Sequence, residues 1–312
     1  MKALVTGGAG FIGSHLAEAL CRRGANVVVL DDLSSGDLRN LAWRQPGEAL
    51  EFVQGDAGDE VLLRKLAPGC DWIFHESAIA SVPLSVAKPR ESHRANLEAT
   101  LTLLLAAREA GVRRFVFASS SAIYGDSDAA VKHESHPPNP LTPYGLQKFA
   151  SERYVRMFHE FYELPTVSLR YFNVFGPRQA FDSPYSGVIA KFCTGLLAGQ
   201  APTIFGDGLQ SRDFIYVANV VAANLLAVEQ PAEQVAGRVF NIGAGASLNL
   251  RQLLAELNQL TGRNVAPVFA PARPGDVRFS EADISAARAD LGYAVQVSWR
   301  EGLRRTLDFY RP

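Results

Sequence analysis

The first 170 residues alternate short apolar runs with longer segments of helical periodicity. Six runs are predicted to be strands: residues 3–6, 27–30, 51–53, 72–74, 115–118 and 167–170. Most of them are continuously apolar, which is typical of strands buried on both faces of a sheet. The segments predicted to be helices include residues 12–23, 90–110 and 143–162. This repeated alternation predicts an α/β fold, in which a doubly wound parallel sheet carries helices on both faces.

The pattern becomes less regular after about residue 173, where prolines and glycines interrupt it. A regular pair returns at residues 215–228 and 239–242, followed by a predicted helix at 248–260, a strand near 265–269 and a terminal helix from Ser298. A length of 312 residues suggests about two domains. We predict a larger domain of residues 1–172 plus 213–243, and a smaller, interleaved α/β substrate domain of residues 173–212 plus 244–312.

A glycine-rich loop follows the first predicted strand and opens the first helix. Gly7, Gly10 and Gly13 have a GxxGxxG spacing, which lets the backbone approach a pyrophosphate at a helix N-terminus. The second strand ends in Asp31, whose carboxylate would bind the adenosine ribose and repel the 2′-phosphate of NADP. The loop therefore predicts a Rossmann domain that binds NAD. Asp56, after the third strand, is a candidate partner of the adenine and on spacing alone equally a turn-capping residue.

Charge and cysteine content exclude several classes of partner. The formal net charge is −1 at pH 7, so the chain has no overall attraction to nucleic acid or to an anionic membrane. Its three cysteines form no C-x-x-C pair, which is typical of buried thiols in a reducing compartment rather than of a metal site or a disulfide framework. No signal peptide and no long apolar span is evident. We expect a cytoplasmic, soluble protein without a metal.

Tyr144 and Lys148 are four residues apart at the start of a predicted helix and therefore share one face. The fifth strand ends in three serines, Ser119 to Ser121, at the sheet edge where ligands bind in doubly wound folds. A Lys148 ammonium would favour the Tyr144 phenolate, whose ordinary pKa is about 10. With a serine hydroxyl bridging to the substrate, these residues suit removal of an O–H proton while NAD takes a hydride from the same carbon.

Six motifs resemble those of the extended short-chain dehydrogenase/reductase superfamily, and within it the UDP-glucose and UDP-N-acetylglucosamine 4-epimerases. They are TGGAGFIG at residues 6–13, SSSAIYG at 119–125, PYGLQK at 143–148, LRYFNVFGPR at 169–178, GDGLQSRDFIYV at 206–217 and RPGD at 273–276. The resemblance covers essentially the whole chain. It implies reversible C4 epimerisation of UDP-hexoses through a 4-keto intermediate, with tightly bound NAD, in a homodimer.

The resemblance also implies roles for individual residues. The catalytic set is Ser120, Tyr144 and Lys148, with Ser121 as the alternative serine. The cofactor-binding set is Gly7, Gly10, Phe11, Ile12, Gly13, Asp31, Asp32, Leu33, Ser35, Gly36, Asp56, Ala57, Ser77, Ala78, Ala118, Tyr144, Lys148 and Tyr171. The substrate-binding set is Ser81, Ser120, Asn173, Val188, Lys191, Ile204, Arg212, Arg273, Asp276 and Ser280. In that set Asn173 and the two arginines would hold the diphosphate, and Asp276 would bind the uridine ribose.

Two departures from related enzymes bear on the reaction. Sugar-nucleotide 4,6-dehydratases usually carry Thr-Asp-Glu where this chain has Ser120-Ser121-Ala122, and the missing acid and base argue against elimination of water. Glu76 stands where the family usually has a small or neutral residue, and its role is left open; the preceding His75 is predicted to be a hydrogen-bonded core residue. A sugar-nucleotide decarboxylase or reductase remains an alternative, and a silent NAD-binding regulator is a weaker one.

The resemblance also implies which sugars fit the pocket and where two copies of the chain would meet. In the epimerases a bulky residue shortly after the RPGD segment can close the sugar pocket, and alignment places Ser280 there. Its small side chain leaves room for an N-acetyl group, so we expect both UDP-glucose and UDP-N-acetylglucosamine to fit. Part of the helix after Lys148, together with residues 96–110, is expected to form a dimer bundle.

Overall fold

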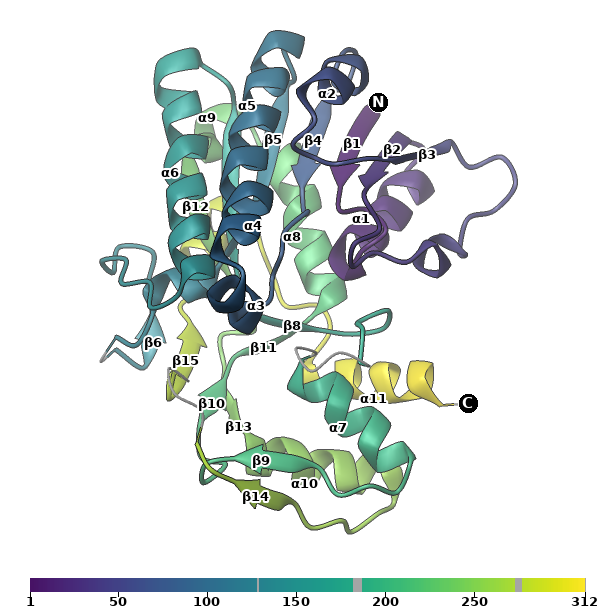
Figure 1. Cartoon of the computed structure of the whole chain (residues 1–312), viewed down its shortest axis with the longest axis vertical. Coiled ribbons are helices and arrows are strands. Elements are labelled where there is room, and N and C mark those ends of the chain that lie inside the picture. Colours follow the sequence, from purple (N-terminus) through teal and green to yellow (C-terminus); the bar gives the residue numbers. More distant parts are fainter. Residues whose placement is uncertain (128, 182–186, 273–276, 312) are drawn as a thin grey trace.

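A computed structural model describes residues 1–127, 129–181, 187–272 and 277–311. A seven-stranded sheet lies at the centre of the larger part of the molecule (Figure 1). Its order is β12-β7-β5-β4-β1-β2-β3, and every neighbouring pair is parallel. Its strands are β1 (Lys2–Thr6), β2 (Asn26–Asp31), β3 (Leu50–Gln54), β4 (Trp72–His75), β5 (Arg114–Ser120), β7 (Thr166–Tyr171) and β12 (Arg238–Ile242). The predicted doubly wound parallel sheet is confirmed.

Helices cover both faces of this sheet. One face carries α1 (Phe11–Arg22), α8 (Val217–Glu229) and α9 (Ala232–Val235), and the other carries α2 (Glu60–Leu66), α5 (Ala99–Ala110) and α6 (Pro143–Tyr162). Because successive side chains of a strand point to opposite faces, Leu4 joins the core under α5 while Val5 joins the core under α1. The continuously apolar strands of the sequence are therefore explained by burial on both sides.

The two long predicted helices have different outcomes. α6 has the predicted bounds, because Thr142 caps it by accepting a hydrogen bond from the Gly145 N–H at 3.2 Å and Pro143 occupies its first position. The helix predicted at residues 90–110 is divided. Its parts are α4 (Pro89–His93), a π-helical turn (Arg94–Glu98) and α5, and the short α3 (Val82–Ala87) precedes them.

The smaller part of the molecule contains short strands and three helices, seen below the sheet in Figure 1. A four-stranded sheet has the order β13-β10-β15-β6, and two further pairs are β8–β11 and β9–β14. The strands are β6 (Val131–Lys132), β8 (Asn173–Phe175), β9 (Thr203–Phe205), β10 (Ser211–Arg212), β11 (Phe214–Tyr216), β13 (Leu248–Asn249), β14 (Val268–Ala270) and β15 (Phe279–Ala282). The helices α7 (Val188–Leu197), α10 (Leu250–Thr261) and α11 (Trp299–Tyr310) share one apolar core.

Strands of the two predicted domains pair with one another. β8 of the predicted smaller domain pairs with β11 of the larger one, and β6 of the larger one pairs with β15. The domain boundaries themselves stay a prediction. The helix predicted at 248–260 begins at Leu250, because Asn249 and Gln252 form a capping box and the two residues before the helix belong to β13.

Two further features concern location. Cys21, Cys70 and Cys193 are buried free thiols, as the sequence predicts. No helix in the described parts of the chain is both long and apolar enough to cross a membrane. The cytoplasmic location stays a prediction.

Candidate active site

The predicted cofactor-binding residues gather at one edge of the large sheet. They lie at or just beyond the carboxyl ends of six neighbouring strands, in the order β7, β5, β4, β1, β2 and β3. Tyr171 ends β7, Ala118 is near the end of β5, and Ser77 follows β4. This is the edge at which doubly wound sheets bind ligands, next to the position where the strand order reverses.

The glycine loop is packed too closely for side chains. Gly7 has a φ of 67°, and a Cβ added to it would lie 2.7 Å from the Cα of Ser77. A Cβ on Gly13 would overlap the carbonyl oxygen of Gly7. The loop therefore brings bare backbone to the N-terminus of α1, which is a cradle suited to a pyrophosphate.

Asp31 is buried at the end of β2 and holds the surrounding loop. Its carboxylate accepts hydrogen bonds from the N–H groups of Ala9 at 3.0 Å and Leu33 at 2.9 Å. Burial raises the pKa of Asp31, and these two hydrogen bonds oppose the shift. Since a carboxylate has about four acceptor positions, capacity remains for ribose hydroxyls.

Asp56 takes the structural role that the sequence left open. Its Oδ1 accepts a hydrogen bond from the Gly58 N–H at 2.8 Å, and its Oδ2 lies 3.6 Å from Arg94. The side chain is half exposed. It closes a turn after β3, and any contact with adenine stays a prediction.

Tyr144 and Ser120 meet at the carboxyl edge of the sheet. Tyr144 lies in the first turn of α6, where its N–H donates to Ser85 Oγ at 3.2 Å. Burial raises the pKa of Tyr144, and a hydrogen bond with the Ser120 side chain opposes the shift. The neighbouring Ser119 is directed elsewhere, because its hydroxyl donates to Glu152 at 2.7 Å. Ser120 thus contacts Tyr144 while Ser119 contacts Glu152, and the catalytic role of Ser120 stays a prediction.

Lys148 lies one turn beyond Tyr144 on α6 and is only 3% exposed. Its Nζ donates to the carbonyl oxygen of Ala118 at 2.7 Å and lies 4.8 Å from the centre of the Phe117 ring. Burial lowers the pKa of Lys148 to about 8, and the Glu76 carboxylate opposes the shift. The ammonium is therefore held at the end of β5, the strand that carries Ser120.

Sequence reasoning missed a buried ion pair behind this edge. Arg170 of β7 forms a bidentate pair with Glu152 of α6, at 2.7 and 2.9 Å, and also donates to the Tyr124 hydroxyl at 2.8 Å. Ser119 binds the same carboxylate. Glu152 is four residues after Lys148 and shares its helix face, so the spacing contained a signal for it.

His75 and Glu76 lie side by side at the end of β4 but differ in role. His75 is fully buried, and its two ring nitrogens lie 2.8 Å from Thr6 Oγ1 and 2.9 Å from Thr100 Oγ1. The prediction of a hydrogen-bonded core histidine is confirmed. Glu76 is partly exposed and accepts a hydrogen bond from the Tyr171 hydroxyl at 2.8 Å.

Most of the predicted substrate residues lie in the predicted smaller domain, whereas Ser81 and Ser120 lie in the larger one. Asn173 Nδ2 donates to the Asp213 carbonyl oxygen at 3.3 Å, and Arg212 pairs with Ser280 across β10 and β15. The Ile204 side chain is fully buried in the apolar core of the smaller domain, and any contact of this residue with the substrate stays a prediction. Ser81 caps α3, and Val188 and Lys191 lie on α7. Arg273 and Asp276 lie outside the described residues.

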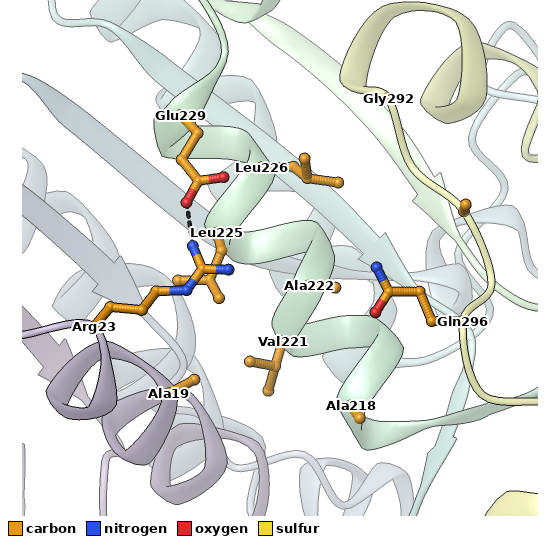
Figure 2. A pocket seen from close by; sticks show the side chains of 11 residues that line it. Ala19, Arg23, Ala218, Val221, Ala222, Leu225, Leu226, Glu229, Gly292 and Gln296 are labelled. Atoms are coloured by element: carbon orange, nitrogen blue, oxygen red, sulfur yellow. Dashed lines mark hydrogen bonds and ion pairs between the residues drawn. The ribbon is translucent and has the colours of Figure 1, made fainter.

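Two surface pockets lie away from this edge. Figure 2 shows one of about 310 Å³, lined by α1 and α8, across which Arg23 forms an ion pair with Glu229. The other, of about 600 Å³, lies beside Glu152 and Arg170. Neither is lined by a predicted cofactor or substrate residue.

Comparison with known proteins identifies the family. The NAD dependent epimerase/dehydratase family matches residues 3–243. The chain belongs to this family. It is 41% identical over 315 residues to a UDP-glucose 4-epimerase of Mycolicibacterium smegmatis, with 100% of this chain and 99% of that protein covered.

Solved structures of this NAD dependent epimerase/dehydratase family agree closely with the fold. A UDP-N-acetylglucosamine 4-epimerase from Methanobrevibacter ruminantium, in complex with UDP-N-acetylmuramic acid, has a TM-score of 0.94 at 38% identity, over 99% of this chain and 97% of that one. A UDP-glucose 4-epimerase from Thermotoga maritima with UDP-glucose has a TM-score of 0.93 at 40% identity, over 100% and 99%. The resemblance drawn from the sequence is confirmed, and NAD is the cofactor of the family.

Proposed function

We propose that this protein is a UDP-hexose 4-epimerase that works through a 4-keto sugar with tightly bound NAD. The observation that carries the proposal is the meeting of Tyr144 and Ser120 at the edge of the sheet, next to the glycine cradle and the buried Lys148. The similarity of the whole chain to UDP-sugar 4-epimerases supports it.

The residues around the glycine loop fit NAD. Gly7 and Gly13 let the loop pack closely at the N-terminus of α1, where a Cβ would collide with the Ser77 main chain or the Gly7 carbonyl oxygen, and Asp31 offers a buried carboxylate at the end of the next strand. When bound, NAD supplies a reversible hydride acceptor for C4. The chain would contribute binding, orientation and a water-poor cleft.

Three side chains would take part in moving the proton of the sugar O4 hydroxyl. Ser120 would hydrogen-bond the sugar oxygen and the Tyr144 hydroxyl, with which it already interacts. Tyr144 would take the O4 proton in one half of the reaction and return it in the other. The Lys148 ammonium would favour the phenolate form. Because the keto sugar can turn within its pocket before it is reduced, the two C4 epimers interconvert.

Dehydration is the main alternative, because dTDP-D-glucose 4,6-dehydratases are among the relatives. Elimination of water needs an acid and a base near C5 and C6 of the sugar. The corresponding positions here are Ser121 and Ala122, which have no carboxylate. The three-residue segment from Ser120 therefore favours epimerisation.

The test is to mix the purified protein with UDP-glucose, without added NAD, and to follow the anomeric signals by NMR. We expect UDP-galactose to accumulate until the two sugars reach equilibrium, with no net redox change. Loss of water or a requirement for stoichiometric NADH would contradict the proposal and indicate a dehydratase or a reductase. Release of CO₂ when UDP-glucuronic acid replaces UDP-glucose would indicate a decarboxylase.

A homodimer through α6 is part of the proposal. Leu146, Tyr154, Met157 and Phe161 are exposed apolar side chains on the face of α6 opposite to Lys148. Burial of such a stripe against a second copy would remove a contiguous apolar surface from water. The second copy is expected to place its own α6 there.

The dimer is tested by sedimentation velocity. The wild-type protein is expected to sediment as a dimer and Phe161→Glu as a monomer, because a charge at this 72% exposed position would be buried in the interface. Phe309→Glu, at an exposed position on α11, is the matched control and should remain dimeric. A monomeric wild type, or a dimeric Phe161→Glu, would contradict this interface.

A further inference from the structure

Glu76 is a charged side chain that the proposed reaction does not use. It follows β4 directly, and its N–H donates to the Thr6 carbonyl oxygen at 3.2 Å. The glycine loop packs on the main chain at this point, since a Cβ on Gly7 would lie 3.0 Å from the Glu76 carbonyl carbon. Glu76 therefore lies where the cofactor loop meets the catalytic edge of the sheet.

A hydrogen-bond chain with a defined direction ends on Glu76. Asn224 of α8 is fully buried, and its Nδ2 donates to the Tyr171 hydroxyl oxygen at 2.7 Å. Tyr171, 7% exposed, donates its single proton to Glu76 Oε1 at 2.8 Å. A donor directed at a carboxylate favours its charged form. The side chains of β7 and α8 thus orient Glu76 as an anion.

Lys148 reaches the same point of the sheet edge from α6. The register of β4 and β5 sets His75 opposite Phe117, so Glu76 follows β4 at the level of Ala118, whose carbonyl oxygen accepts from Lys148 Nζ at 2.7 Å. Burial raises the pKa of Glu76 to about 7, and the Tyr171 hydrogen bond and Lys148 oppose the shift. In the same way, Glu76 opposes the effect of burial on Lys148. A buried ammonium is costly without a compensating charge, and a carbonyl oxygen and an aromatic ring compensate it only partly.

The other groups packed around this pair do not compete with it near neutral pH. Burial, reinforced by the nearby ammonium, lowers the pKa of His75 to about 3 and leaves the ring neutral. Burial raises the pKa of the Tyr144 and Tyr171 phenols above the ordinary value. Arg170 is charged but is neutralised by its bidentate pair with Glu152.

We propose that Glu76 is a positioning residue, the counter-charge that keeps the Lys148 ammonium charged and thereby supports the Tyr144 base. The proposal deepens the epimerase function and rests on it. A carboxylate here would extend the alkaline range of the enzyme, because the Tyr144 phenolate loses its support where Lys148 is neutral.

The experiment compares Glu76→Gln, Glu76→Asp and wild type as purified holoenzymes. The first readout is the pH profile of kcat for UDP-glucose, and the second is the titration of lysine ε-carbons by ¹³C NMR. The Lys148 signal is identified by its loss in Lys148→Met. In Glu76→Gln we expect the alkaline limb and the Lys148 titration to move down by about one pH unit, because the negative charge is lost while the shape is kept.

Glu76→Asp should stay closer to wild type in both readouts, because it keeps the charge. If the role of Glu76 were purely structural, Glu76→Gln would instead stay closer to wild type than Glu76→Asp, since glutamine conserves the volume and aspartate does not. Glu51→Gln, at an exposed position on β3, is the matched control and should leave both readouts unchanged. An unmoved Lys148 titration in Glu76→Gln would overturn the proposal. If the wild type does not epimerise, the NMR titration still decides the role of Glu76, so the two failures are distinguishable.

Discussion

Replacing Tyr144 by Phe is expected to lower kcat for UDP-glucose by about 10²–10⁴-fold, the usual contribution of a positioned general base. Phe keeps the ring at the start of α6 and removes only the hydroxyl that interacts with Ser120. Without it, Ser120 has no phenol hydroxyl through which the O4 proton can pass. Initial rates from the anomeric NMR signals measure the effect.

The Tyr144→Phe result needs a control for folding. Tyr162→Phe removes a hydroxyl from a half-exposed position on the same helix and is expected to keep the wild-type rate. The thermal unfolding midpoint of Tyr144→Phe should stay within a few degrees of wild type. If Tyr144→Phe keeps more than about a tenth of the wild-type kcat, Tyr144 is not the base.

The sequence predicted the central sheet well because its signal is local. A continuously apolar run between two helical segments reports burial on both faces, and all six predicted strands are present. The two-residue strands β6, β10 and β13 gave no such signal. A strand of two residues is too short to show an apolar or alternating pattern. These strands form only because segments far apart in the chain pair with one another.

The candidate site was predictable where its residues are close in sequence. The glycine loop and the Tyr144–Lys148 spacing are short-range patterns on one loop and one helix face. Ser120 was chosen from the resemblance, by counting back from Tyr124-Gly125. The hydrogen bond of Ser119 to Glu152 was not predictable, because it joins two different elements. The Tyr171–Glu76 contact joins residues 95 apart in the chain, and only the parallel sheet brings them together.

Replacing Ser280 by Tyr is expected to abolish turnover of UDP-N-acetylglucosamine and to spare UDP-glucose. Ser280 lies on β15 directly opposite Arg212 of β10, which is proposed to hold the diphosphate, and is 8% exposed. In the proposed pocket a phenol ring at this point would fill the space of the N-acetyl group, whereas the plain sugar does not need that space. We expect the ratio of kcat/KM for the two sugars to change by more than about 100-fold.

Ser280→Ala is the matched control, because it keeps the side chain small and should leave both substrates active. Both substitutions keep the backbone contact with the neighbouring strand, since the Ser280 carbonyl oxygen accepts from the Asp213 N–H at 2.7 Å. Retained UDP-glucose turnover shows that Ser280→Tyr is folded. Equal loss of both activities in a folded protein would mean that Ser280 does not line the N-acetyl side of the pocket, and that sugar choice is made elsewhere in the smaller domain.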